Sequence, residues 1–398
     1  WGAVSHLNAV ADTPELRSAY NEALPKVTTF YTQLGADERM YAKYKAIAKT
    51  DEAQAEARRL NPARRKALSN ALRDFVLSGA ELRGAAKQRF AAIQDRSAEL
   101  QQRYSEHVLD ATDGWHLDVE REELVGVPDD VLQATADAAQ AAGQAGHRLA
   151  LHFPVYGPVM QYADNRALRE TLYKAYVTRA SEHGAAELDN SALMRELLEL
   201  RAEEAQLLGY QNFADVSLVP KMAASADKVI GFLNDLAVRA KPYAERDWQE
   251  LTGFARDQLG LADVQAWDVA YVSEKLKEAR YAFSEQELKR YFTEHKVLAG
   301  LFEIVQTVFE VDIKPDTAPL WHPDVRFFRV ERAGKLLAQF YLDPYARPGK
   351  RPGAWMDDAR LRWQRPEPDG ALQTPVATLT CNFQTPVGGQ SALLTHDD

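Results

Sequence analysis

The chain has 398 residues, of which 46% are hydrophobic and 27% are charged. This composition is typical of globular proteins and excludes a disordered or fibrous chain, and the length allows two or three ordinary domains. The formal net charge is -10, so nucleic acid and anionic lipid, both polyanions, are disfavoured as partners.

The sequence also indicates a compartment. The single cysteine, Cys381, can form neither an intrachain disulfide nor a cysteine zinc cluster, which favours a reducing compartment and predicts the cytoplasm. The longest apolar stretch, residues 297–309, is interrupted by Glu303 and Gln306 and is too short to span a bilayer. We expect no membrane span. Nothing after Trp1 resembles a secretion signal, and we expect the sequence to begin part-way into a longer protein.

Helix signals dominate the first three hundred residues. Residues 12–15, Asp-Thr-Pro-Glu, place a capping side chain and a first-turn proline ahead of an apolar stripe, so a helix is expected there. Asn61 and Pro62 repeat the device before a second helix with an apolar stripe that should face a core and a stop at Gly79. A long helix starting near Leu82 is predicted to pair with it in antiparallel fashion.

Two further helices have clear ends. Asn190 is the expected N-cap of one, and Gly209 ends it where a left-handed residue is favoured. The other is predicted over residues 225–259, with Pro242 kinking or dividing it.

Strand signals begin after about residue 310. Residues 325–330 and 337–342 are rich in branched and aromatic side chains and flank Ala333 and Gly334, which predicts a β-hairpin. A loop rich in Pro, Gly and Arg follows, and residues 375–383 are a third strand candidate.

A search for catalytic motifs finds little. None of the nine histidines has another at i+4, the spacing that places two imidazoles on one helix face toward a metal. There is no glycine-rich phosphate loop, nucleophile elbow or cysteine–histidine signature. The residues alone therefore indicate a soluble, mostly helical protein with a small β region.

A family resemblance adds to this interpretation. Residues 375–383, followed by Pro386-Val387 and residues 392–397, resemble the run that leads into the zinc-binding helix of the oligopeptidase A and thimet oligopeptidase family of zinc metallopeptidases. Further segments resemble the family in the same order, namely residues 1–20, 77–82, 207–210, 266–269, 300–302, 343–350 and 353–356.

The resemblance implies a mainly α fold, in which many helices form a channel, with a small β-sheet near the C-terminal end. It implies an N-terminal helical region over residues 1–150, a central helical region over 151–310, and the start of an α+β catalytic region over 311–398. It also implies a zinc-dependent endopeptidase of the cytoplasm that acts on short oligopeptides admitted to the channel.

The sequence departs from the family in one respect. Family members carry His-Glu-x-x-His on a helix that should open soon after Asp398, and this motif is absent from residues 1–398. No catalytic residue and no zinc ligand can therefore be assigned here, and we expect these residues alone to be inactive. His396 belongs to the approach to that helix, with Thr395 or Asp397 as its cap, rather than to a metal site.

The candidate substrate-binding residues are those of the last strand, whose backbone is expected to pair with an extended peptide: Thr378, Leu379, Thr380, Cys381, Asn382 and Phe383. The alternative is that this strand lies inside the sheet. Expected partners are short peptide substrates and a second chain that carries the rest of the catalytic domain. Two other functions stay open, a dipeptidyl carboxypeptidase of the same broad family and a non-catalytic helical scaffold that binds peptides.

Overall fold

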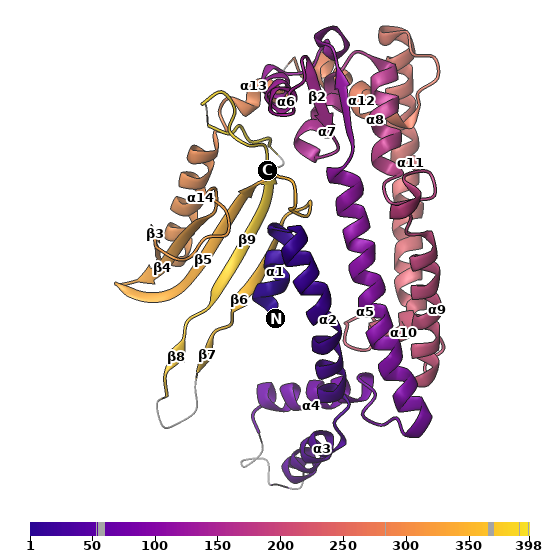
Figure 1. Ribbon diagram of the computed structural model, residues 1–398, viewed down its shortest axis with the longest axis vertical. Coiled ribbons are helices and arrows are strands. Elements are labelled where there is room, and N and C mark those ends of the chain that lie inside the picture. The colour runs from indigo at the N-terminus through magenta and orange to yellow at the C-terminus, as the bar shows by residue number, and fades with distance from the viewer. Residues whose placement is uncertain (53, 55–59, 283, 365–369, 390, 397) are drawn as a thin grey trace. The chain divides into compact units, whose positions relative to one another are not determined.

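Most of the chain folds into helices, which confirms the predicted mainly α class (Figure 1). The computed structural model describes residues 1–52, 54, 60–282, 284–364, 370–389, 391–396 and 398. The α-helices are α1 (Gly2–Val10), α2 (Pro14–Gly35), α3 (Glu38–Glu52), α4 (Pro62–Leu77), α5 (Gly84–Asp113), α6 (Asp129–Ala141), α7 (Phe153–Tyr162), α8 (Arg166–Val177), α9 (Ser191–Leu207), α10 (Phe213–Leu218), α11 (Ala226–Leu259), α12 (Val269–Tyr281), α13 (Glu285–Lys289) and α14 (Glu294–Phe309). Short 3-10 turns are η2 (Arg121–Leu124), η3 (Ala186–Leu188) and η4 (Ala266–Asp268). No helix in these described ranges is long and apolar enough to cross a membrane.

The chain forms two compact units, each built from several stretches of sequence. The first unit contains Trp1–Arg17, Val108–Leu188 and Trp248–Asp398, and the second contains Ser18–His107 and Asp189–Asp247. Helices α2, α5 and α11 each contribute residues to both units. The division at residues 150 and 310 stays a prediction.

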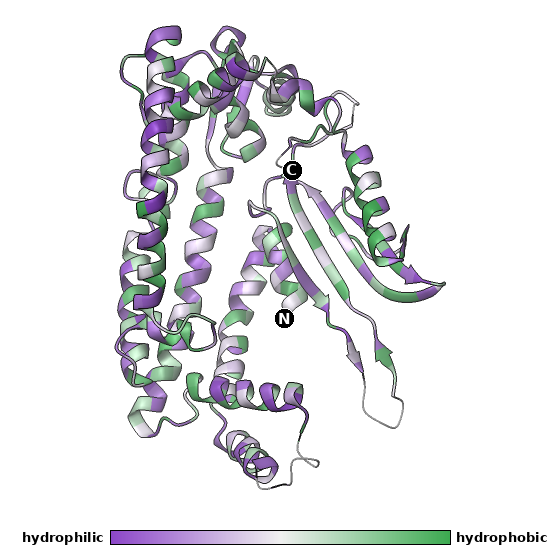
Figure 2. Ribbon diagram, turned by 180° about the vertical axis from the view of Figure 1, so that it is seen from behind, coloured by the Kyte–Doolittle hydropathy of each residue, from purple (hydrophilic) through white to green (hydrophobic). Residues whose placement is uncertain are grey.

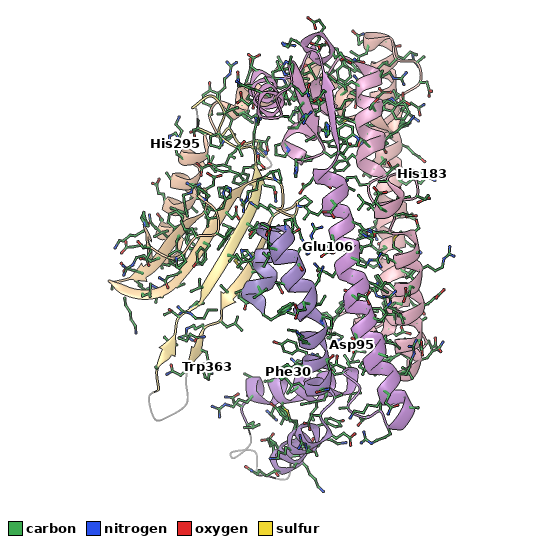
Figure 3. All side chains as sticks on the ribbon, in the orientation of Figure 1. Phe30, Asp95, Glu106, His183, His295 and Trp363 are labelled. Carbon is green, nitrogen blue, oxygen red and sulfur yellow. The ribbon has the colours of Figure 1, made fainter. Side chains whose placement is uncertain are left out.

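The second unit is organised around an antiparallel pair of helices, α5 and α9. Ile93 and Leu100 of α5 pack against Leu193, Leu197 and Leu200 of α9. Two ion pairs join the same helices, since Arg89 lies 2.6 Å from Glu203 and Arg96 lies 2.6 Å from Glu196. On another side of α5, the labelled side chains Asp95 and Glu106 (Figure 3) accept hydrogen bonds from Thr29 (3.4 Å) and Asn21 (2.9 Å) of α2.

The expected pairing of α4 with α5 is therefore wrong. Helix α4 packs against α3 instead, where the Phe75 ring contacts those of Tyr41 and Tyr44 at centroid distances of 5.7 and 5.3 Å. No residue of α4 is fully buried, so its apolar stripe faces a shallow contact rather than a core. Figure 1 shows α4 crossing the direction of α5.

The predicted helix ends are mostly confirmed. Asn61 Oδ1 accepts a hydrogen bond from Arg64 N (2.9 Å), and Gly209 has the expected positive φ of 83°. Asn190 occupies the N-cap position of α9, but its side chain does not cap the helix. Pro242 does not divide α11, which runs through it as one helix.

A small sheet in the first unit was not predicted. Strands β1 (His116–Val119) and β2 (His147–Ala150) pair in antiparallel register on helix α6. Val119 and Leu149 join a core formed with α6, α7 and α8. The expectation that strands begin only after residue 310 is wrong, because strands of four residues are too short to show a clear alternation.

The main sheet lies in the C-terminal part of the chain. Its strands are β3 (Asp312–Pro315), β4 (Arg326–Arg332), β5 (Lys335–Tyr345), β6 (Trp355–Arg360) and β9 (Val376–Phe383), in the order β3-β4-β5-β9-β6. The predicted hairpin is confirmed as β4 and β5, and its turn residues Ala333 and Gly334 have φ values of 49° and 76°. Strands β7 (Trp363–Gln364) and β8 (Leu372–Gln373) form a separate ribbon between β6 and β9.

The two faces of this sheet are covered by different helices. On one face Phe328, Leu342 and Cys381 pack with Leu298 and Phe302 of α14. Figure 2 shows hydrophobic residues along these strands and along α14. Helix α1 covers the opposite face, where His6 Nδ1 lies 3.5 Å from Thr378 Oγ1.

Candidate functional site

Strand β9 was the predicted site, and it lies inside the sheet. Its neighbours are β5, which runs parallel to it, and β6, which runs antiparallel. Thr378, Leu379 and Thr380 pair with both neighbours, so their backbone groups have no open edge for a peptide. The prediction that a peptide pairs with the backbone of these three residues is therefore wrong. The alternative prediction, that this part of β9 lies inside the sheet, is confirmed for them.

The last three residues of β9 lie beyond the final residue pair with β6. Cys381 is buried against α14, and burial raises the pKa of its thiol. Phe383 pairs with Tyr345, and its carbonyl accepts a hydrogen bond from Ala346 N (3.0 Å). Asn382 donates hydrogen bonds to the carbonyls of Arg351 (3.3 Å) and Gly353.

A cavity opens at this carboxyl end of β9. It has a volume of about 250 Å³, and we call it the strand-end cavity. Asn382 and Phe383 line it together with α7, Lys277 of α12 and Lys289 of α13. Of the six predicted residues, the structure thus brings these two to the cavity, while Leu379, Thr380 and Cys381 do not line it and Thr378 lines a different pocket.

A second, larger cavity adjoins it. This cavity of about 620 Å³ lies between the first turn of α6, helix α13 and residues 384–388 and 391–393. Gln286, Gln384 and Leu393 line both cavities. The end of β9 therefore leads into a space large enough for several peptide residues.

Paired charges surround the strand-end cavity. Lys289 is 4% exposed, and its ammonium lies 3.1 Å from the carboxylate of Asp130, a residue that lines the larger cavity. Lys277 lies 3.1 Å from the buried Glu274, which also accepts a hydrogen bond from Tyr162 (3.1 Å). Each of these lysines has an acidic partner, and the carboxylate-bearing Asp398 lines the cavity as well, so its walls are polar and carry no unpaired lysine among these residues.

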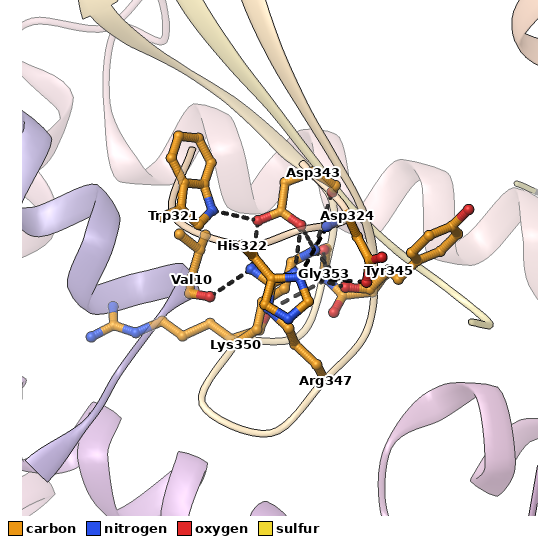
Figure 4. A network of polar contacts seen from close by, with 11 residues as sticks. Val10, Trp321, His322, Asp324, Asp343, Tyr345, Arg347, Lys350 and Gly353 are labelled. Atoms are coloured by element: carbon orange, nitrogen blue, oxygen red, sulfur yellow. Dashed lines mark hydrogen bonds and ion pairs between the residues drawn. The ribbon is translucent and has the colours of Figure 1, made fainter. Parts of the chain in front are cut away.

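A buried network fixes the strand end from the other side (Figure 4). Lys350 and Asp343 are both 1% exposed, and the Lys350 ammonium donates to Asp343 Oδ1 (2.8 Å) and to the carbonyls of Asp343 (3.1 Å) and Tyr345 (2.7 Å). Arg347 donates to both Asp343 carboxylate oxygens (2.6 and 2.7 Å) and to Val10 O (2.8 Å). Trp321 Nε1 also donates to Asp343 (2.9 Å). We call these four side chains the Asp343 network.

The electrostatics of the Asp343 network favour the charged carboxylate. Burial alone would raise the pKa of Asp343, but the hydrogen bonds from Arg347, Lys350 and Trp321 outweigh burial and hold that pKa below its usual value. The network closes the loop between β5 and β6, whose carbonyls at Arg351 and Gly353 accept from Asn382. It therefore positions the end of β9.

Gly349 is required in this loop by its backbone. Its φ is +73°, and a Cβ there would lie 2.7 Å from the carbonyl oxygen of Asp12. Its N–H donates to Asp113 Oδ2 (2.8 Å), and its carbonyl accepts from Asp12 N (3.0 Å). The loop is thereby tied to the segment that joins α1 and α2.

The segment that follows β9 ends in a helix-starting motif. Leu394 N donates to Phe292 O (2.8 Å), which fixes the segment beside α14. Asp398 N donates to Thr395 Oγ1 (3.2 Å), while Asp398 Oδ2 accepts from Thr395 N (2.9 Å). These reciprocal bonds have the pattern of a capping box, with Thr395 in the position of an N-cap. Asp397, the other predicted cap, lies outside the described residues.

Metal-ligating side chains are not gathered at this site. His396 is exposed, and in the part of the chain that the structure describes no three His, Cys, Asp or Glu side chains are placed to hold a metal ion. The described residues therefore do not form a zinc site.

Sequence reasoning missed the roles of Asp343, Lys350 and Lys289. Charged residues are usually exposed, and nothing in the local pattern marks these as buried. The signal that the sequence offered was the resemblance of residues 343–350 to a loop of the family, which did not indicate a buried ionic network.

Comparison with known proteins identifies the family. Residues 159–398 match peptidase family M3, and residues 1–87 match the N-terminal domain of neurolysin and thimet oligopeptidase. The chain belongs to peptidase family M3. Oligopeptidase A of Salmonella typhimurium strain LT2 and that of Escherichia coli K12 are each 46% identical to it over 99% of this chain and 58% of their own length. Dipeptidyl carboxypeptidase of Salmonella typhimurium is 31% identical over 81% of this chain and 47% of its own length.

The family predicted from the sequence is thus confirmed. The chain spans 58% of the length of the oligopeptidase A relatives that it matches.

Proposed function

We propose that the protein containing this chain is a zinc-dependent endopeptidase that cleaves short oligopeptides in the cytoplasm. Membership of peptidase family M3 and similarity to oligopeptidase A along nearly the whole chain support this proposal. The probable cytosolic oligopeptidase A of Arabidopsis thaliana, which is 38% identical, supports the compartment.

The observation that carries the proposal is an open sheet edge at β6, whose first residue, Trp355, pairs with Thr380, two residues before Asn382 of the strand-end cavity. In the described part of the chain, β6 pairs with β9 on one edge and with no strand on the other. An extended peptide that adds to this edge gains main-chain hydrogen bonds that do not depend on its sequence. We therefore assign peptide pairing to β6 instead of β9, with Asn382 and Phe383 contacting the peptide where it enters the cavity.

Zinc is proposed for the whole protein and not for these residues. The described residues offer no metal site, so we expect the ligands outside residues 1–398. The capping box at Thr395 and Asp398 agrees with a helix that begins at this point, where the family resemblance places the zinc-binding helix. When bound, zinc would supply an activated water for attack on a peptide carbonyl.

The test uses an internally quenched fluorescent peptide with both ends blocked. The whole protein should cleave it, lose activity in a chelator and regain activity with zinc, while a protein comprising only residues 1–398 should show no cleavage. Chelator-sensitive cleavage by residues 1–398 would contradict the assignment of the ligands. Absence of any cleavage by the zinc-loaded whole protein would contradict the function.

Dipeptidyl carboxypeptidase activity is the second candidate, because relatives with that name are 31% and 30% identical over 81% of the chain. Peptides with free and amidated C-termini separate the two, with products identified by mass spectrometry. An endopeptidase cleaves both peptides internally. Release of C-terminal dipeptides from the free form alone would favour the second candidate.

A further inference from the structure

A pocket lies on the α1-covered face of the main sheet, next to the open edge of β6. It has a volume of about 190 Å³, and we call it the α1-side pocket. Helix α1 forms one wall, Trp321 and Tyr341 contribute aromatic surface, and β6 forms the rim. The residues that line it are Gly2, Ala3, His6, Leu7, Trp321, Tyr341, Asp357, Asp358, Ala359 and Thr378.

The strand register places a carboxylate at the rim of this pocket. Tyr341 pairs with Thr378, and Thr378 pairs with Asp357, so the three side chains form one row across the same face. The 3.5 Å separation of Thr378 Oγ1 and His6 Nδ1 shows that this face is the one that α1 covers. Asp357 therefore ends the row at the open edge, on the pocket side.

The charge of Asp357 is not neutralised by its neighbours. The side chain is exposed, and it forms no ion pair with any residue that the structure describes. The adjacent Asp358 is also among the lining residues, but it pairs with Ala377, so its side chain belongs to the other face of the sheet. The rim is therefore negative, while Ala3, Leu7 and the aromatic rings behind it are apolar.

His6 provides a spare hydrogen-bonding atom in the same wall. The residue is 8% exposed, and its Nε2 has no hydrogen-bond partner among the described residues. The edge of its ring meets Trp321 at a centroid distance of 4.8 Å. Burial lowers the pKa of His6, which favours a neutral imidazole able to accept a hydrogen bond.

We propose that the α1-side pocket is a subsite for a lysine or arginine side chain of the bound peptide, with Asp357 as its specificity determinant. This inference rests on the proposed pairing of the peptide with β6. A peptide residue opposite Asp357 extends the row of side chains and points to the same face. Its aliphatic stem contacts the apolar wall, and its charged end meets the Asp357 carboxylate and the aromatic rings.

The experiment compares short quenched peptides in which a single lysine is moved along an otherwise neutral sequence, each matched by a peptide with norleucine at that position. With the whole protein, one position should show about a fivefold higher kcat/KM for lysine, the upper range for a partly exposed ion pair. Asp357→Asn should reduce this ratio to near one, and Asp357→Lys should invert it toward a glutamate peptide. Asp312→Asn, which removes a carboxylate from the opposite edge strand β3, should leave the ratio unchanged.

The outcomes separate this inference from the proposed function. Cleavage with equal rates for lysine and norleucine at every position, or a lysine preference that survives Asp357→Asn, would overturn the subsite while the peptidase function stands. If the protein cleaves no peptide, fluorescence anisotropy with the same labelled pairs measures their binding. A lysine preference abolished by Asp357→Asn then supports the subsite, and equal binding refutes it.

Discussion

Lys350 shows how a single side chain can hold a turn in place. Its ammonium uses three acceptors, one carboxylate and two backbone carbonyls, in a site with almost no solvent contact. A buried lysine is tolerated only where its charge is compensated, because the desolvation of an unpaired ammonium is costly. The role of Lys350 is thus to bind the Asp343 carboxylate and two carbonyls at the end of β5 where water has almost no access.

Replacing Lys350 by methionine should lower the free energy of unfolding by about 3 kcal/mol, because Asp343 loses one of its cationic partners in a buried site. Lys335→Met is the matched control, since Lys335 is exposed at the start of β5 and should change stability by no more than about 0.5 kcal/mol. Urea unfolding of the whole protein, followed by tryptophan fluorescence, measures both. Equal effects of the two substitutions would show that the Asp343 network contributes little.

The stability of the protein should also depend on pH through Asp343. Its folded-state pKa is below the ordinary 3.8, so the unfolded chain binds the proton more readily. The carboxylate therefore contributes stability above pH 3.8, and this contribution is lost as the pH falls through the lower folded-state value. Melting temperatures measured from pH 7 down to acid should show this loss.

Asp343→Asn is the variant that tests this origin. It should be less stable than the wild type at pH 7 and should show a weaker dependence on pH in the acid range. Asp358→Asn, at an exposed position of β6, should keep the wild-type slope. If the melting temperature of Asp343→Asn falls with pH as steeply as that of the wild type, the acid sensitivity arises from other carboxylates.

At the level of helices and strands, local signals were reliable and long-range pairings were not. The Asn61 cap, the Gly209 stop and the Ala333-Gly334 turn were predicted correctly because each depends on neighbouring residues. The pairing of α5 with α9 depends on residues about a hundred positions apart, which no local pattern reveals.

Asn190 illustrates the limit of local signals. It stands at an N-cap, yet its side chain joins α5 to α9 by bonding His107 Nδ1 (2.9 Å) and Tyr104 O (3.1 Å). Asp189 accepts the bond from Ser191 N instead (2.8 Å). The residue type was correct for the position, but its partners came from another helix.

Asn190→Ser tests that role, because serine caps helices about as well as asparagine but cannot reach both partners. The substitution should cost about 1–3 kcal/mol in unfolding free energy, the range for leaving buried polar groups unpaired. Asn212→Ser is the matched control, since Asn212 caps α10 through Asp215 N (3.0 Å) and should change stability by only a few tenths of a kcal/mol. Thermal denaturation compares the two variants. Similar losses of stability in both would show that the bonds of Asn190 to α5 contribute no more than an ordinary helix cap.

At the scale of the whole molecule, the class, the family and the third strand were predictable, but the place of that strand in the sheet was not. The alternation of residues 376–383 shows a strand, while strand order depends on β5 and β6 together. The open edge at β6 therefore had no signal of its own, and the candidate site was assigned one strand away from it.

Exposed apolar side chains on α11 predict that residues 1–398 self-associate when no other chain is present. Leu233, Leu236 and Tyr243 recur on one face of α11 and are 54%, 45% and 61% exposed. A contiguous apolar stripe of this kind is normally covered by another part of the protein or by a partner. We expect this chain alone to self-associate, and a second chain carrying the remainder of the catalytic domain to suppress the association.

Size-exclusion chromatography with light scattering measures this, with and without the second chain. Leu233→Gln combined with Leu236→Gln should reduce self-association of the isolated chain, whereas the same change at the exposed polar positions Lys228 and Asn234 of the same helix should not. A monodisperse isolated chain with a single cooperative unfolding transition would contradict the expectation.

The position of β9 inside the sheet, between β5 and β6, also affects how the protein is made. Strand β5 ends at Tyr345, and its parallel neighbour begins only at Val376. At about 5–20 residues per second, a ribosome takes roughly 2–6 s to add residues 346–375, and during that time β5 has a bare hydrogen-bonding edge. Unpaired edges recruit strands from other chains. The nascent polypeptide therefore passes through an interval in which chaperone capture competes with misassembly.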